Sequence, residues 1–75
     1  MAVQTSSINK QAEALRKIQE DLESYLESKQ ETLGMEEDKS SPNQDRVDKY
    51  ENQISILENA KELVEQAIES LEEWE

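Results

Sequence analysis

The stretch from Ser41 to Glu75, SPNQDRVDKYENQISILENAKELVEQAIESLEEWE, decides the fold. It opens with a helix start signal. Ser41 suits the N-cap, Pro42 suits the first helical position because its missing amide needs no partner there, and Gln44 completes a capping box. Apolar residues then recur at steps of three and four, which is the spacing of one side of an α-helix. The stretch therefore predicts one long helix over residues 42–73.

The apolar residues of this helix form two adjacent lines. The first line follows a heptad pattern typical of coiled coils and comprises Val47, Tyr50, Ile54, Leu57, Val64, Ile68 and Leu71, with Lys61 interrupting it. The second line comprises Ile56, Ala60, Leu63, Ala67 and Trp74. Together the lines span about 200° of the helical wheel, which is wider than the stripe that one partner helix covers. The second line is therefore predicted to contact another chain, a second copy in the simplest arrangement or a dedicated different protein as the alternative.

The earlier part of the chain predicts one further helix, over residues 7–33. Its apolar residues lie within an arc of roughly 140° and are Ile8, Ala12, Leu15, Ile18, Leu22, Tyr25, Leu26 and Leu33. Ser6 or Ser7 is expected to cap its start, with residues 1–6 as a flexible N-terminus. Gly34 is expected to end it in a left-handed conformation. Residues 34–41 are then the loop between the helices.

These elements predict an all-α fold in a single domain over residues 1–75: an antiparallel two-helix hairpin that dimerises through the second line into a four-helix bundle. Composition favours association, because only 33% of the 75 residues are hydrophobic and the mean hydropathy is -1.02. A chain this short builds a single core of marginal size. No motif is specific to a known family.

The net charge of -11 restricts the partners of the chain. An acidic chain repels nucleic acid and anionic membrane surfaces, whereas it attracts a basic protein surface. The candidate partner face on the second helix comprises Glu51, Glu58, Glu62, Glu65, Glu69 and Glu72. These residues fall within roughly 80° of the helical wheel. Since no signal peptide or membrane-spanning segment is recognisable, a cytoplasmic location is expected.

The residue types present argue against catalysis. The chain has no Cys and no His, so it offers neither a thiol or imidazole nucleophile nor a zinc–thiolate site. Its many carboxylates fall on the polar side of the helices, where nothing separates their pKa values as acid–base chemistry requires. No catalytic residue, metal ligand or cofactor-binding residue is therefore predicted.

Two functional hypotheses remain. The first is a non-enzymatic protein–protein interaction module that self-associates through its second helix. The alternative is an inhibitor of the type carried by phages and mobile elements, whose acidic face mimics nucleic acid and occupies a basic groove of a nucleic-acid-binding protein.

Overall fold

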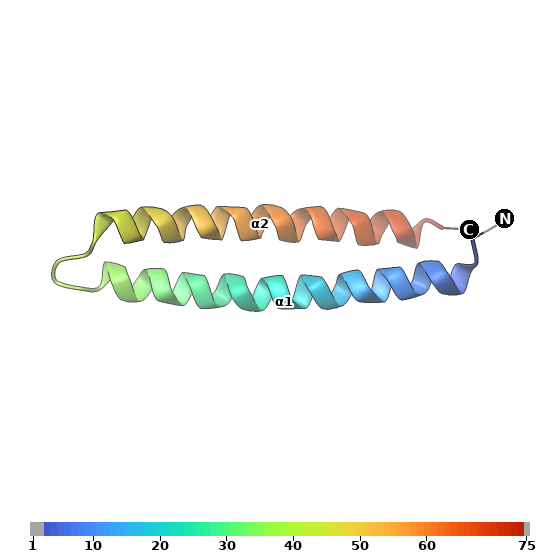
Figure 1. Ribbon diagram of the computed structural model, residues 1–75, viewed down its shortest axis with the longest axis horizontal. Coiled ribbons are helices and arrows are strands. Elements are labelled where there is room, and N and C mark those ends of the chain that lie inside the picture. Colours follow the sequence, from blue (N-terminus) through green and yellow to red (C-terminus); the bar gives the residue numbers. More distant parts are fainter. Residues whose placement is uncertain (1–2, 75) are drawn as a thin grey trace.

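The chain forms a helical hairpin in a computed structural model that describes residues 3–74 (Figure 1). Helix α1 spans Thr5–Glu37 and helix α2 spans Gln44–Glu72. The two helices lie antiparallel along their whole length and give a rod of 61 × 16 × 14 Å. The predicted all-α hairpin is thus confirmed, and residues 3–74 contain no strand.

The seam between the helices has a heptad pattern on both sides. On α2, the predicted first line faces α1, with Val47 and Ile68 buried and the other members half-buried. On α1, the facing residues are Ile8, Ala12, Leu15, Gln19, Leu22, Leu26, Lys29, Leu33 and Glu36. The apolar residues that are buried number only three, Ala12, Val47 and Ile68, and no side chain is fully buried in the described chain. One seam therefore gives the hairpin a thin core.

The two lysines of the seam have partners on the opposite helix. Lys61 occupies a heptad core position and reaches Glu23 of α1, with 3.7 Å between Nζ and Oε1. The ammonium group of Lys29 lies 5.2 Å from the centre of the Tyr50 ring, which is a cation–π distance. Both lysines contribute their aliphatic stems to the seam and keep their charges near its edge.

The predicted helix boundaries need correction at the start of α1 and at its end. The helix begins at Thr5, after Gln4 as N-cap, so Thr5 and Ser6 are helical and neither Ser6 nor Ser7 is the cap. Met1 and Ala2 lie outside the described residues. At the other end, α1 continues through Gly34 to Glu37, and Gly34 does not adopt a positive φ. The helix continues because the next three residues are good helix formers, which outweighs the modest cost of one interior glycine.

The start of α2 differs from the prediction by two residues. Asn43, not Ser41, is the N-cap, and its Oδ1 accepts a hydrogen bond from the Arg46 amide at 3.2 Å. Asn caps a helix as well as Ser does, and this position leaves Pro42 outside the helix. Gln44 does not close a capping box; its side chain donates to Asp48 instead. The loop is therefore 38–43 rather than 34–41.

A buried carboxylate closes this loop. Glu36, on the last turn of α1, accepts a hydrogen bond from the Asn43 backbone amide at 3.0 Å and lies 2.6 Å from the ammonium group of Lys39. The hydrogen bonds from Lys39 and Asn43 hold the pKa of Glu36 below its usual value. One side chain thus links the end of α1, the loop and the cap of α2.

Candidate functional site

The hairpin has two broad faces that differ in chemistry. On each helix, the residue after a seam residue points to one face and the residue before it points to the other, since successive residues are about 100° apart. Because the helices are antiparallel, the residues that follow seam residues share one face across both helices. The ion pairs between Arg16 and Glu72 and between Lys61 and Glu23 run along that face.

The face formed by the following residues is almost purely acidic; we call it the acidic face. On α2 it carries all six residues of the predicted partner face together with Asp48, and all are exposed. Helix α1 adds Glu13, Glu20, Glu23, Glu27 and Glu37. Arg16 is its one basic residue and is paired with Glu72. The predicted acidic surface is therefore wider than one helix, because α1 extends it.

The opposite face is apolar and poor in charge; we call it the apolar face and define it by Ile18 and Tyr25 of α1 and Ile56 and Leu63 of α2. These four side chains are 45–58% exposed. Ala60 and Ala67 lie beside them and are half-buried. Among the residues that precede seam residues, the charged ones are Asp21, Arg46 and Lys49. Large apolar side chains held in water on one side of a hairpin favour binding over solubility.

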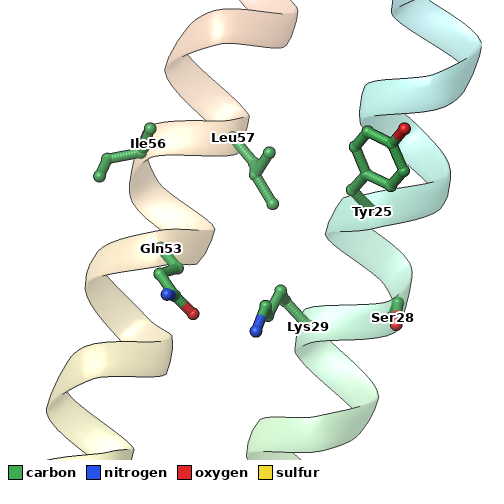
Figure 2. A pocket seen from close by; sticks show the side chains of 6 residues that line it. All are labelled: Tyr25, Ser28, Lys29, Gln53, Ile56 and Leu57. Atoms are coloured by element: carbon green, nitrogen blue, oxygen red, sulfur yellow. The ribbon is translucent and has the colours of Figure 1, made fainter.

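A hollow in the apolar face shows that the two helices contribute to it together. It has a volume of about 350 Å³ and is lined by Tyr25, Ser28, Lys29, Gln53, Ile56 and Leu57. Figure 2 shows Leu57 directed between the helices, while the side chain of Ile56 is directed away from α1. The side-chain oxygen of Gln53 is buried there without a hydrogen-bond partner.

The predicted self-association residues differ in how exposed they are. Ile56 and Leu63 are the prominent apolar residues of α2, with exposed fractions of 58% and 56%. Trp74 follows the end of α2, is 43% exposed, and donates its backbone amide to the Leu71 carbonyl oxygen. Ile56, Leu63 and Trp74 are thus placed where another chain can reach them.

Two residues of the apolar arc predicted for the first helix, Ile18 and Tyr25, do not lie in the seam. Both are exposed, and Gln19 and Lys29 occupy seam positions instead. The heptad spacing of Ala12, Leu26 and Leu33 indicates which side of α1 lies in the seam. This side is hard to recognise in the sequence, because polar residues interrupt the heptad and other apolar residues lie outside it.

Neither a metal cluster nor a membrane-spanning helix is found in the described residues. No three Asp or Glu side chains within residues 3–74 converge as metal ligands do, because the carboxylates are spread along the rod. Across the same range, neither helix combines the length and apolar character needed to cross a membrane.

Comparison with family models, with curated proteins and with solved structures found no match to this chain.

Proposed function

We propose that this chain is a non-enzymatic interaction module that self-associates through the exposed apolar residues of α2, forming a homodimeric four-helix bundle. The observation that carries the proposal is the exposure of Ile56 and Leu63 on a face that bears few charges. A face of this kind loses little electrostatic hydration when it is covered, so burial of its apolar side chains gives a net gain.

The surface area of the hairpin supports this proposal. The chain exposes 5848 Å², about 1,100 Å² more than the roughly 4,700 Å² expected of a compact monomer of 8.7 kDa. A standard protein interface buries about 800 Å² on each partner. Covering the apolar face once would therefore bring the chain close to the exposure of an ordinary folded protein.

Sedimentation equilibrium tests the dimer directly. At micromolar concentration the chain should sediment with twice its sequence mass, while Ile56→Glu and Leu63→Glu should sediment as monomers because each buries a carboxylate in the interface. Ser55→Glu adds the same group beside Ile56 but on the acidic face, so it should remain dimeric. A wild-type chain that stays folded and monomeric at these concentrations would refute the proposal.

A second candidate function is mimicry of nucleic acid by the acidic face. The width of that face favours it, since Glu13, Glu20 and Glu27 of α1 extend the glutamate rows of α2. Neighbouring side chains on a helix are about 5–6 Å apart, which is comparable with phosphate spacing along a strand. A two-helix acidic surface can occupy a broader basic groove than a single row can.

Competition experiments distinguish mimicry of nucleic acid from an acidic face that contacts only water. The wild-type chain and a variant with Glu58, Glu62, Glu65 and Glu69 changed to Lys serve as baits. Mimicry predicts that only the wild type captures a nucleic-acid-binding protein, that duplex DNA releases it, and that affinity falls steeply with salt. If the captured proteins do not bind nucleic acid, or if the variant captures them equally well, the acidic face is not a mimic.

A further inference from the structure

The apolar side chains of the two helices are arranged in layers across the hairpin. Tyr25 and Ile56 line the same hollow, so they lie at one level of the rod (Figure 2). Ile18 precedes Tyr25 by seven residues, and Leu63 follows Ile56 by seven residues on the antiparallel helix. Seven residues are about two helical turns, or roughly 10 Å. Ile18 and Leu63 therefore form a second layer on the same face, with one residue from each helix.

This arrangement suits a second copy of the chain. A two-fold interface brings a surface against itself, so the surface must be complementary to its own image. Two layers of similar composition, each with one large apolar residue per helix, meet this condition when they stack on each other. The acidic face does not, because it would place glutamates against glutamates.

The hollow provides the space that close packing needs. It lies between the helices and is open to the apolar face. In a dimer it can receive an apolar side chain from the second copy, as a knob enters a hole in a helical bundle. Gln53, whose side-chain oxygen is buried without a hydrogen-bond partner, lines the same hollow.

We infer that α1 and α2 contribute jointly to the dimer interface, so that Ile18 and Tyr25 bind the second copy as Ile56 and Leu63 do. This inference rests on the proposed self-association and goes beyond it. The alternative dimer joins two hairpins along α2 alone and leaves both Ile18 and Tyr25 in water. In the joint arrangement, four helices surround one core.

Substitutions on α1 distinguish the joint dimer from the dimer formed along α2 alone. Ile18→Glu and Tyr25→Glu should each raise the dimer dissociation constant at least about a hundredfold, because a carboxylate then lies in the apolar interface. Ser24→Glu places the same group next to Tyr25 on the exposed outer side of α1 and should leave the constant within about twofold. Circular dichroism at high concentration checks that each variant is helical.

Chemical nitration gives a readout that does not depend on the folding of the α1 variants. Tyr25 is 57% exposed in the hairpin. In the dimeric wild type it should be nitrated by tetranitromethane at least about tenfold more slowly than in a monomeric Leu63→Glu variant, whereas Tyr50, in the seam, serves as the internal reference. If α2 variants dissociate the chain while α1 variants do not, and Tyr25 reacts equally in both states, the joint interface is wrong although self-association stands. A monomeric wild type would instead refute both the joint interface and the proposed self-association.

Discussion

At the scale of single residues, Glu36 is the side chain with the most connections outside its own helix. Its two oxygens bind the Asn43 amide and the Lys39 ammonium group, and it is buried among otherwise exposed loop residues. A buried carboxylate is tolerated only when hydrogen bonds and opposite charge replace its water. Glu36 therefore stabilises the loop only in its ionised form.

The pH dependence of Glu36 follows from its lowered pKa. A depressed pKa in the folded state means that its contribution is complete above the unfolded-state pKa of about 4.3 and is lost as pH falls through the folded-state value. Thermal unfolding should show Glu36→Gln melting below the wild type at pH 7, with the two melting temperatures converging as the pH falls below the lowered folded-state pKa of Glu36. Glu37→Gln, a change at the exposed neighbouring residue, should keep the melting temperature of the wild type throughout this pH range. A constant difference across this pH range would contradict the assigned role.

At the scale of the elements, the sequence predicts the helices better than their ends. The spacing of apolar residues is repeated over many turns, so the existence, order and pairing of two helices follow from it. A helix end depends on a few local interactions. Ser41 and Asn43 both suit an N-cap, and the choice depends on the bond from the Asn43 amide to Glu36, a contact between elements that neither segment reveals alone.

Gly34 gives a direct test of where α1 ends. A left-handed glycine would resist replacement, whereas a glycine inside a helix gains from it. A Cβ added at Gly34 meets nothing within 4 Å. Gly34→Ala should therefore stabilise the chain by about 0.5–1 kcal/mol, seen as a melting temperature higher by about 2–8 °C. A lower melting temperature would mean that α1 ends before this residue.

The candidate site was predictable on α2 and not on α1. Ile56 and Leu63 lie outside the apolar stripe that a single partner helix covers, and the sequence alone shows that the apolar arc of α2 is this wide. Ile18 and Tyr25 do not make the apolar arc of α1 unusually wide, because Gln19 and Lys29 stand where apolar residues would otherwise lie in the seam. The total apolar arc of α1 therefore resembles that of an ordinary one-sided helix, and only the three-dimensional pairing shows which residues are left outside.

At the scale of the whole molecule, the seam provides only a thin core, so the proposed self-association should add to the stability of the fold. Three buried apolar residues leave the isolated hairpin with little hydrophobic stabilisation. If a second copy binds only the folded state, mass action raises the melting temperature with protein concentration.

Thermal unfolding over a range of concentrations measures this coupling. Between about 1 and 100 µM, the melting temperature of the wild type should rise by several degrees. That of Leu63→Glu should stay constant because the variant cannot associate. A wild-type melting temperature independent of concentration would show that the hairpin is stable alone.

The strong negative charge of the acidic face has a consequence for how far assembly can proceed. If two apolar faces cover each other, both outer surfaces of the resulting particle are strongly acidic, and like charges keep such particles apart. Growth then stops at two chains because the next layer is repelled. Acidification toward the isoelectric point of 4.3 removes this barrier, so light scattering should detect larger particles there while they remain absent at neutral pH.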